Sequence, residues 1–583
     1  MKYFSNKEIE QLLRTISAAY AATGGNSFKV IAYENAANSV EHATSELKDL
    51  WDDGKLDTVP GLGKSIQAHL DELFRTGKVK HFEELKKSLP KGMFPLLGLV
   101  GLGPKNAYKL AKELKIKTIK DLEDAAKAGR IRELPGFGEK SEKDILVSIS
   151  ESKTKTTDRY PLPTAFNQAE RILQHLRSLK EVERAEPLGS LRRMVATVGD
   201  VDIAVASEKP EQVIEHFKKF REISRILNAG PRKSSALLYN GLRIDLMVQP
   251  TKAFGALLQH FTGSKNHNIH LRELAQKKDI KVSDLGIEKG GKLHEFETEE
   301  EFYKFLGMDY IEPEIREDTG EIEAAIAKKL PDLVSLKDIK GDIHLHSSYN
   351  IEPSHDLGKN SMEEIIKKAK SLKYEYIGLS DHSPGVSTHS KAKIVDLIKK
   401  RKDKIEQLKS SNKNIGLLNL LEIDILTNGE LSVPVEGLKL LDGSIAGIHS
   451  SHSQDKKTIT ERLLVACRSP YVQLISHPTG RLLLQRESYD VDWPKVFEEC
   501  QKTGTMLEIN AWPSRLDLPD TLVREALSYG IKFIINTDAH AVGQMDNMHF
   551  GVSVARRGWA TKKDITNTRP WVEFKKLFTP FKK

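Results

Sequence analysis

The sequence predicts a multidomain protein of the α and α/β classes, with a helical N-terminal region, a mixed sheet with helices in the middle, and a βα barrel at the C-terminal end. Three observations predict this order. A Gly-x-Gly pattern recurs three times within the first 140 residues, each time at the start of a helical pattern. Two strand-like runs near residues 200 and 245 carry acids. After residue 340, apolar strand-like runs recur, and several of them end in His or Asp.

Length and composition set limits on the kind of protein. The chain has 583 residues, which gives room for about three to four domains. Its formal net charge of +8 is modest, so any surface that binds nucleic acid must be local. Two cysteines, Cys467 and Cys500, exclude a disulfide framework and fit a reducing compartment. The sequence has neither a signal-peptide pattern nor a long apolar run, so we expect a cytoplasmic protein without a membrane partner.

The first 150 residues consist of short helical patterns separated by glycine turns. The repeated turns lie at Val59–Lys64, Val100–Lys105 and Leu134–Lys140. The pattern resembles the hairpin of helix-hairpin-helix motifs, whose backbone N–H groups bind a DNA phosphate beside a helix N-terminus. A single copy would more often be a plain turn, but three copies, each followed by a lysine, favour sequence-independent binding to the DNA backbone. The candidate DNA-binding residues are Gly61, Gly63, Lys64, Gly101, Gly103, Lys105, Gly136, Gly138 and Lys140.

Three acids lie in the two strand-like runs of the middle region. Asp200 and Asp202 alternate with apolar residues, so both carboxylates point to the same face of a strand. Asp245 lies within a second run, residues 242–248. Three carboxylates from neighbouring strands suit Mg²⁺, which takes oxygen ligands and leaves positions open for phosphates. Two such metals can activate an attacking oxygen and stabilise a leaving one, which nucleotidyl transfer requires.

Residues before these acids could hold a phosphate. Gly189 allows a close backbone approach, and Ser190 and Arg193 can donate hydrogen bonds to an anion. A lone Asp-x-Asp would more often be a solvated pair at the end of a sheet. The preceding Gly-Ser and the third acid on the next strand favour the metal site.

The order Gly-Ser-x-x-Arg, Gly-Asp-x-Asp and Arg-Ile-Asp, at residues 189–193, 199–202 and 243–245, resembles the palm of family X DNA polymerases. The resemblance implies a nucleotidyltransferase palm in which Asp200, Asp202 and Asp245 are catalytic and bind two Mg²⁺ or Mn²⁺ ions. It also implies that Ser190 and Arg193 hold the incoming triphosphate. The implied nucleotide-binding residues are Gly189, Ser190, Arg193, Gly199, His260, Phe261, Gly263 and Asn268.

Residues 258–268 resemble the family's Tyr-Phe-x-Gly-Ser segment, which lies beside the nucleotide sugar. His260 stands in place of the tyrosine, so discrimination between deoxyribose and ribose is either looser or achieved by other residues. Asn268 matches an asparagine that touches the minor-groove edge of the incoming base. A plain glycine turn between two helices is the alternative interpretation of this segment.

The first Gly-x-Gly unit resembles the small domain that removes 5′-deoxyribose phosphate through a lysine Schiff base in vertebrate members of the family. In this sequence His69 stands at the position of that lysine, and Asn35 stands at another basic position. A histidine cannot form the stable Schiff base that a lysine amine forms. We therefore expect phosphate binding without lyase activity, since nothing marks the nearby Lys64 as a nucleophile.

The character of the chain changes at Lys340. His344 and His346 lie on one face of a strand-like run, which is a frequent metal-binding arrangement. In a βα barrel the chemistry lies at the C-terminal ends of the strands. A single histidine there would more often be a surface or core residue, but a whole set favours a multinuclear metal site. The further candidates near strand ends are His355, Asp356, His382, Glu422, His449, His477, Asp538 and His540.

Residues 341–552 resemble the polymerase and histidinol phosphatase (PHP) domain, a distorted seven-stranded βα barrel with three metal ions. The resemblance implies three ligand groups: His344, His346, Glu422 and Asp538; then Glu422, His449 and His477; then His382, His540 and either His355 or Asp356. His452 is expected to be peripheral. Mn²⁺, Zn²⁺ and Fe²⁺ all accept His and carboxylate ligands, so the identity of the three metals stays open.

Together, the two resemblances imply a family X DNA polymerase that fills short gaps in repair, including base excision repair. They also imply a Mn²⁺-dependent 3′–5′ exonuclease. Whether the protein also cleaves at abasic sites stays open. Expected partners are gapped or primer–template DNA and dNTPs, and the protein is expected to act as a monomer near the nucleoid. The alternative is a PHP phosphatase of small phosphoesters with a DNA-binding front half. A purely structural DNA-binding scaffold is the other alternative, and the intact metal sets argue against it.

The domain boundaries follow from these assignments. We expect a helical DNA-binding domain at 1–90, a fingers-like helical region at 91–155, the palm at 156–250, a thumb-like subdomain at 251–315, a linker at 316–338 and the PHP domain at 339–583.

Overall fold

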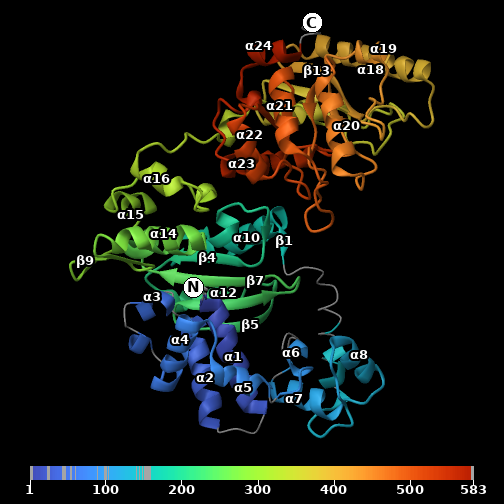
Figure 1. Ribbon diagram of the computed structural model, residues 1–583. Coiled ribbons are helices and arrows are strands. Elements are labelled where there is room, and N and C mark those ends of the chain that lie inside the picture. Colours follow the sequence, from blue (N-terminus) through green and yellow to red (C-terminus); the bar gives the residue numbers. More distant parts are fainter. Residues whose placement is uncertain are drawn as a thin grey trace. The chain divides into compact units, whose positions relative to one another are not determined.

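The computed structural model describes residues 4, 6–22, 27–41, 47–52, 56–59, 61–87, 89–96, 102, 104–139, 141–143, 145–146, 149 and 159–578 (Figure 1). Three of the predicted DNA-binding residues, Gly101, Gly103 and Lys140, lie outside these residues. The chain divides into two compact units, Met1–Asp158 and Arg159–Lys583. No helix in the described part of the chain is long and apolar enough to cross a membrane.

The first unit is helical, as the sequence predicts. In α4 the buried residues Ile66, Leu70, Leu73 and Phe74 recur at helical spacing, and the helix begins directly after Gly63. This face packs with Ile9 and other residues of α1 in one apolar core. Within the described residues of this unit, the helices with assigned bounds are α1 Asn6–Ala22, α2 Ser27–Glu41, α3 Leu47–Asp52, α4 Lys64–Thr76, α5 Lys80–Lys87, α6 Met93–Leu96, α7 Pro104–Glu113 and α8 Ile119–Lys127.

The second unit begins with a five-stranded mixed sheet in the order β2-β4-β7-β6-β5. β4 and β7 are parallel, while the other neighbouring pairs are antiparallel. The strands are β2 Arg184–Pro187, β4 Val201–Ala206, β5 Ile223–Ala229, β6 Lys233–Leu238 and β7 Arg243–Gln249; β1 Tyr160–Pro161 pairs separately with β3 Thr197–Val198. The helices here are α10 Leu162–Arg177, α11 Gly189–Arg192 and α12 Pro210–Phe217.

A smaller subdomain follows the mixed sheet. Its helices and a three-stranded antiparallel sheet enclose a separate core that includes Leu271, Phe302 and Ile322. Its first helix also packs on the mixed sheet, because Phe254 and Leu257 contact the apolar side of β4 and β7. The elements are α13 Phe254–Thr262, α14 Lys265–Gln276, β8 Ile280–Ser283, β9 Gly286–Lys289, β10 Lys292–His294, α15 Glu299–Phe305 and α16 Glu321–Ile326.

The C-terminal part is a parallel barrel of seven strands in sequence order, β11 to β17. The barrel nearly closes, because His346 N donates to Ala539 O at 2.9 Å and Leu345 forms a parallel bridge with Ala539. The strands are β11 Gly341–Asp342, β12 Tyr376–Leu379, β13 Gly416–Asp424, β14 Gly443–Gly447, β15 Val472–Ile475, β16 Met506–Asn510 and β17 Phe533–Asn536.

Helices surround the barrel strands (Figure 1). The last turns of the chain fill the barrel's N-terminal end, where Phe574 stacks on Tyr376 at 4.2 Å between ring centroids and Trp571 covers Gly416. The opposite end, where the strands finish, is therefore the open one. The helices are α17 Met362–Ser371, α18 Lys391–Ser411, α19 Val435–Leu438, α20 Lys456–Arg468, α21 Trp493–Thr503, α22 Asp520–Ser528, α23 Met548–Arg557 and α24 Trp571–Phe574.

A fully buried ion pair holds α18 against the strand ends. Arg401 donates to Asp381 Oδ2 at 2.9 and 2.7 Å, to Asn419 Oδ1 at 2.6 Å and to the Leu379 carbonyl at 3.0 Å. Asp381 in turn accepts the backbone N–H of Ser347. This network fixes the segment that carries His382.

Replacing Arg401 with Met should lower the free energy of unfolding by about 3–5 kcal/mol, because Asp381 would remain buried without its cation. Urea unfolding of the full chain, followed by circular dichroism, measures the change. Lys399→Met, on the exposed side of the same helix, is the control and should change stability by less than about 0.5 kcal/mol. Equal stability of the two variants would show that the buried pair is unimportant.

Candidate active sites

The predicted acids Asp200 and Asp245 both lie near Asp202, since the charges of both act on it. β4 and β7 are parallel in a register that pairs Asp202 directly with Asp245, and Asp200 lies just before β4. Gly189 has φ +57°, and a Cβ atom there would lie 2.7 Å from Asp202 Oδ2. A larger residue at 189 would therefore collide with the acid, so glycine is required by this close approach.

The acids repel one another. Burial, and then the charges of Asp200 and Asp245, raise the pKa of Asp202 to about 8. Protein groups offset the negative charge of Asp245, because Ser235 Oγ donates a hydrogen bond to it and Arg243 Nε donates to its Oδ2 at 3.0 Å. A divalent cation bound among these carboxylates would remove the repulsion, and carboxylate oxygens suit such an ion.

Arg193, predicted to hold a triphosphate, is engaged by protein groups in the absence of nucleotide. Its Nε donates to Glu317 Oε1 at 3.0 Å and its Nη1 donates to the Thr262 carbonyl at 2.5 Å. Arg557 of α23 donates to the same Glu317 oxygen at 3.0 Å and to the Arg193 carbonyl at 2.7 Å. Glu317 is thus shared between an arginine of the nucleotide site and an arginine of the barrel.

The segment that resembles the sugar-binding region lies between α13 and α14. Burial lowers the pKa of His260 to about 3, so its ring is neutral, and it lies edge-on to Phe261 at 4.8 Å. Asn268 turns back onto α13, donating to the His260 carbonyl at 2.6 Å and accepting from Gln259 at 2.9 Å. Gly263 lies beside Arg193, which a Cβ atom there would approach to 3.3 Å. Ser190 precedes Arg193 in the short helix α11, and Gly199 precedes Asp200 in a bend.

The glycine turns of the first unit have the predicted geometry where they are described. Gly61 has φ +83° and Gly136 has φ +86°, conformations that favour glycine, and Gly63 and Gly138 are exposed beside them. Lys64 begins α4 and Lys105 lies in the first turn of α7, both exposed.

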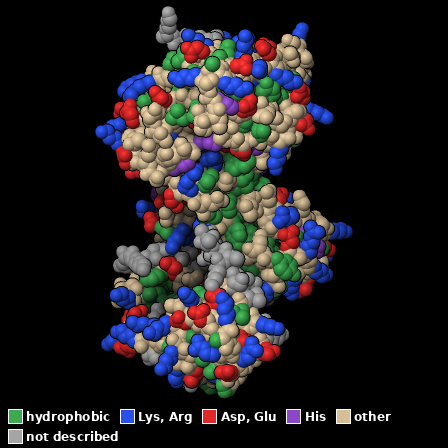
Figure 2. Space-filling model, turned by 90° about the vertical axis from the view of Figure 1, so that its right-hand side faces the viewer, with side chains coloured by type: hydrophobic (Ala, Val, Ile, Leu, Met, Phe, Trp, Pro, Cys, Tyr) green, Lys and Arg blue, Asp and Glu red, His purple; other side chains and the backbone are tan. Residues whose placement is uncertain are grey.

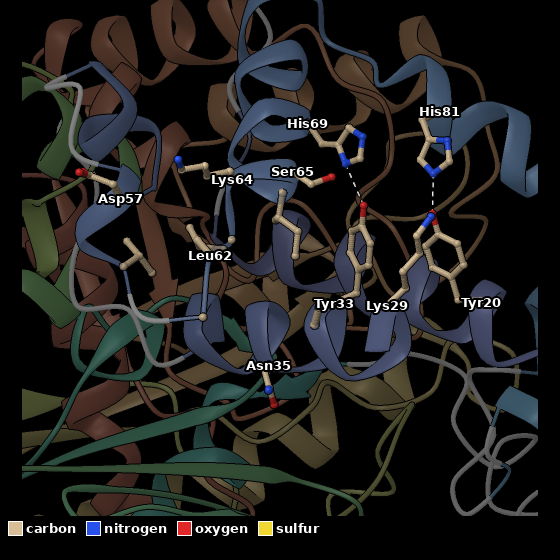
Figure 3. Close-up of a pocket in the computed structure, with 15 residues that line it drawn as sticks. Tyr20, Lys29, Tyr33, Asn35, Asp57, Leu62, Lys64, Ser65, His69 and His81 are labelled. Atoms are coloured by element: carbon tan, nitrogen blue, oxygen red, sulfur yellow. Dashed lines mark hydrogen bonds between the residues drawn. The ribbon is translucent and has the colours of Figure 1, made fainter. Parts of the chain in front are cut away.

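A pocket of about 920 Å³ lies between the first glycine turn and α2 (Figure 3). His69 accepts or donates a hydrogen bond with the Tyr33 hydroxyl at 2.8 Å, and His81 does so with Tyr20 at 2.5 Å. Burial and the neighbouring His81 lower the pKa of His69, which is therefore neutral at physiological pH. Figure 3 shows the two histidines side by side over the tyrosines, with Lys64 at the opposite side. Asn35 also lines the pocket.

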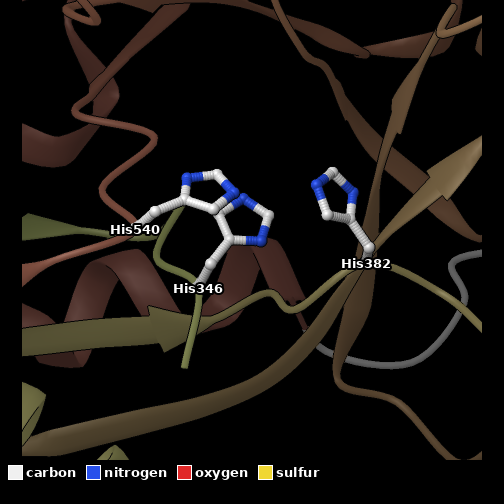
Figure 4. Close-up of side chains that lie close together, drawn as sticks. All are labelled: His346, His382 and His540. Carbon is white, nitrogen blue, oxygen red and sulfur yellow. The ribbon is translucent and has the colours of Figure 1, made fainter. Parts of the chain in front are cut away.

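The predicted ligands of the barrel converge at the open end. His344, His346, Glu422 and Asp538 each offer an atom within 4.8 Å of the others. His346, His382 and His540 form a second such group. Figure 4 shows the rings of His346 and His540 stacked, 4.0 Å apart, with His382 facing them from β12's end. Histidines (purple) also reach the surface together in the uppermost part of Figure 2, which is the barrel part of the chain.

Glu422 is the centre of this cluster. His344 Nε2 and His382 Nδ1 lie 3.1 Å from its Oε2, while His449 Nε2 at 3.2 Å and His477 Nε2 at 2.9 Å reach its Oε1. Burial alone would raise the pKa of Glu422, but the surrounding histidines, led by His344, lower it well below its usual range. Glu422 is therefore ionised and surrounded by imidazoles.

The structure separates the two candidates that the sequence left open. Asp356 lies 3.6 Å from His382 Nε2 and 3.5 Å from His540 Nε2, so it faces both histidines of the third ligand group. His355 instead contacts Asp424 at 3.0 Å, and Asp424 also accepts from His449 Nδ1 at 2.6 Å. His355, Asp424 and His449 also form a group that could hold a metal ion, so the two candidates lie beside different histidines.

The donor set fits metal ions. Among the described residues, several buried ligand atoms have no hydrogen-bond partner, including His344 Nε2, Glu422 Oε2 and His540 Nε2. Such orphaned atoms are rare in folded proteins, and here they point at one another from different strands. Nitrogen and oxygen donors in this arrangement suit Mn²⁺, Zn²⁺ or Fe²⁺. His452 is separate, and its ring lies against Tyr489 at 6.2 Å.

Two acids that sequence reasoning missed hold the ligands in position. Glu508, fully buried on β16, contacts His344 Nδ1 at 2.7 Å and accepts the backbone N–H of His477 at 2.7 Å. Asp424 likewise contacts His449 Nδ1, at 2.6 Å. A carboxylate behind a ligating histidine fixes the ring and its tautomer. The signal was present in the sequence, since Glu508 interrupts an apolar strand just as Asp245 does.

The chain is similar to known proteins over nearly its whole length. A family model described as DNA polymerase beta thumb matches residues 257–317, a helix-hairpin-helix domain matches 4–79, and a SAM-like helix-hairpin-helix tandem matches 95–151. DNA polymerase/3′-5′ exonuclease PolX of Bacillus subtilis is 34% identical over 567 residues, 97% of either chain. DNA polymerase lambda of Arabidopsis thaliana is 24% identical over 53% of this chain and 62% of its own. A probable phosphatase of a Thermoanaerobacter species is 24% identical over 39% of this chain and 89% of its own.

The pKa of Asp202 generates a prediction about stability. Because its folded-state pKa is raised, the carboxyl stabilises the fold only while protonated, and that contribution is lost as pH rises from about 4 towards 8. Without metal, Asp202→Asn should therefore gain stability relative to wild type, by about 1–3 kcal/mol at pH 8 and less at pH 5. Thermal unfolding in EDTA at both pH values measures the gain.

With added Mg²⁺ the wild type should become more stable than Asp202→Asn, because only the wild type keeps the full set of metal ligands. Glu208→Gln, an exposed acid after the same strand, is the control and should show no gain at either pH. A gain that is the same at pH 5 and pH 8 would contradict the assignment.

Proposed function

The chain belongs to the bacterial family X DNA polymerases that join a polymerase core to a C-terminal PHP domain, and we propose that its two metal sites divide the work of DNA synthesis and 3′–5′ exonucleolytic cleavage. The chain covers 97% of the Bacillus subtilis relative, whose name states both activities. The observation that carries the proposal is that one chain holds two strand acids in register, with Asp200 just before the strand, and a separate cluster of His and carboxylate groups at a barrel end.

At the mixed sheet, the reaction is attack of a primer 3′-hydroxyl on the α-phosphate of a dNTP, with release of pyrophosphate. Asp200 and Asp202 face the position where Mg²⁺ or Mn²⁺ would bind, and such ions lower the barrier by neutralising phosphate charge. Asp245, beside Asp202, orients the 3′-hydroxyl and takes up its proton. Arg193 gives up its hydrogen bond to Glu317 and binds the triphosphate instead. Together with Ser190 it then offsets the negative charge of the departing pyrophosphate.

The sugar-binding segment completes the nucleotide site. Phe261 and the neutral ring of His260 present an apolar edge where the family has a tyrosine, while Gly263 keeps the backbone close to Arg193. Asn268 would have to leave the His260 carbonyl in order to reach the base.

At the barrel, hydrolysis takes place beside Glu422. The three ligand groups would hold three divalent metals, Mn²⁺, Zn²⁺ or Fe²⁺, which when bound activate water and bind the phosphate. His344, His346, His382 and Asp538 form the buried side of the site, and His540 and Asp356 form its more exposed side. His449 and His477 hold Glu422 from the third side.

The polymerase reading is favoured over the alternative of a small-molecule phosphatase with a DNA-binding front half. The phosphatase relatives match only 39% of this chain, whereas the polymerase relative spans it. An enzyme of that alternative class would also have no need for Asp200, Asp202 and Asp245.

We further propose the biological setting. The protein fills short gaps during DNA repair, including base excision repair, acts on gapped or primer–template DNA as a monomer, and works in the cytoplasm at the nucleoid. The glycine turns of the first unit bind the DNA backbone. The pocket of His69 binds phosphate without Schiff-base chemistry, because His69 is a neutral imidazole held by Tyr33.

The two activities should be separable by mutation. On a 5′-labelled primer bordering a one-nucleotide gap, Asp200→Asn with Asp202→Asn should reduce gap filling at least about 10²-fold while Mn²⁺-dependent shortening without dNTPs persists. His344→Ala should do the opposite, abolishing shortening and sparing extension. Both reactions are read on the same sequencing gel.

Loss of both activities in one of these variants, despite a normal unfolding transition, would mean that the two sites are not independent. Shortening that persists in His344→Ala would locate the nuclease elsewhere. Extension that persists in the double variant would refute the palm assignment.

DNA binding by the first unit should show in the salt dependence of affinity. Removing a lysine that neutralises one phosphate reduces the slope of log K against log salt by about 0.9. Lys64→Ala and Lys105→Ala should each lower the slope by that amount without changing sequence preference, measured by fluorescence anisotropy on gapped duplex. Lys413→Ala, an exposed lysine of the barrel part, is the control, and an equal slope change there would refute the assignment.

A further inference from the structure

A short loop after strand β16 lies beside the barrel's metal-ligand cluster. Residues 511–516 leave the strand after Asn510 and return at Asp517, which forms an antiparallel bridge with Asn510. Arg481 Nε donates to the Arg515 carbonyl at 2.9 Å, and Leu483 N donates to the Ser514 carbonyl at 2.6 Å. The loop is therefore closed at its base and fastened along its length.

Arg515, in this loop, places its guanidinium group beside the cluster. Its side chain is 19% exposed, and its Nε lies 3.9 Å from Asp538 Oδ2. Among the described residues, no acceptor lies within hydrogen-bond distance of its guanidinium, although an arginine carries five N–H donors. Because the side chain is partly accessible to solvent, these donors are available to a ligand that enters the open end of the barrel.

The charge balance indicates what that ligand is. Asp538 is also within reach of His344 and His346, at 3.5 and 3.1 Å, and belongs to the ligand group of a metal. If metals occupy the cluster, Asp538 cannot neutralise Arg515 as well. The guanidinium of Arg515 is then available to an incoming anion, and a phosphate diester oxygen fits the planar, bidentate donors of arginine.

Trp512 stands on the other side of the same loop. Its N–H backbone group donates to Asn510 Oδ1 at 2.8 Å, and its ring meets His540 edge-on at 5.7 Å between centroids. The ring is only partly buried. The Arg515 backbone N–H donates to the Trp512 carbonyl at 2.8 Å, so the two side chains arise from one tight turn. An exposed aromatic face one turn away from a phosphate site is suited to stack a nucleic-acid base.

We propose that Arg515 and Trp512 are the substrate-binding residues of the barrel site: Arg515 contacts the terminal phosphodiester of a single-stranded DNA 3′ end, and Trp512 stacks the last base. The proposal rests on the exonuclease function proposed above and names how the site recognises its substrate. In the reaction, a water oxygen bonds to phosphorus, the P–O3′ bond breaks, the departing 3′-oxygen takes a proton, and a nucleoside 5′-monophosphate leaves.

Trp512 is tested with two 5′-labelled single strands that differ only at the 3′ end, a normal nucleotide or an abasic tetrahydrofuran residue. Trp512→Ala should lower kcat/KM about tenfold on the normal end, mainly by raising KM, and leave the abasic end unchanged. Trp512→Phe should retain most of the wild-type value, because a phenyl ring still stacks. An equal loss on both ends would overturn the stacking role.

Arg515 is tested by Arg515→Lys, which keeps the charge but loses the bidentate donors. Cleavage of both DNA ends and of bis(p-nitrophenyl) phosphate should fall about 10- to 100-fold, because the contact is to the phosphodiester that all three share. Affinity for the single strand in Ca²⁺, read by fluorescence anisotropy, should also fall. Metal content, measured by plasma mass spectrometry, should equal that of wild type, and loss of metal would overturn the proposal by making Arg515 a support for Asp538.

Arg468→Lys, on the exposed side of α20, is the matched control and should leave all three substrates unaffected. The wild type separates the two levels of inference. If wild type with Mn²⁺ cleaves bis(p-nitrophenyl) phosphate but no DNA end, the exonuclease function itself is refuted. If it cleaves DNA and the two variants match it, only the roles of Arg515 and Trp512 are refuted.

Discussion

A buried carboxylate surrounded by imidazoles is the interaction on which the C-terminal half depends. Glu422 sits at the end of β13 and is reached by His344, His382, His449 and His477, each from a different strand or strand end. An isolated buried charge would be expensive, so its position is tolerated only because positive or metal-binding groups converge on it. The parallel barrel supplies that convergence, since all its strands finish at one end.

The surroundings of the acids differ between the two candidate metal sites. At the barrel the acids have histidine partners, and second carboxylates such as Glu508 and Asp424 hold those histidines in place. At the mixed sheet the acids face each other, and Asp202 keeps its proton to about pH 8 because of burial and its two neighbours. The barrel site is organised before metal arrives, whereas the palm acids are relieved by it.

The predicted nucleotide site contacts the barrel through the Glu317 carboxylate and through a hydrogen bond from Arg557 to the Arg193 carbonyl. Glu317 accepts from Arg193, which would bind the triphosphate, and from Arg557, which is also paired with Asp520. When Arg193 turns to a nucleotide, Glu317 keeps its second cation and does not become an unpaired charge. Helix α23, which carries Arg557, follows β17, and Asp538 and His540 lie just after that strand. The contact of Arg193, Glu317 and Arg557 therefore joins the mixed-sheet region to the barrel.

The sequence by itself determined the helical, mixed-sheet and barrel classes, the palm acids and the histidine set, because each rests on local periodicity or on spacing within a motif. Side-chain alternation predicted that Asp200 and Asp202 share one face, and the strand-end rule predicted where His477 and Asp538 would lie. The different neighbours of His355 and Asp356 required the tertiary structure, because adjacent residues in an irregular segment point in directions that no periodicity sets. The partners of Arg193, the support given by Glu508 and the place of Arg515 also depend on residues distant in sequence, whose meeting only the packed strands and loops decide.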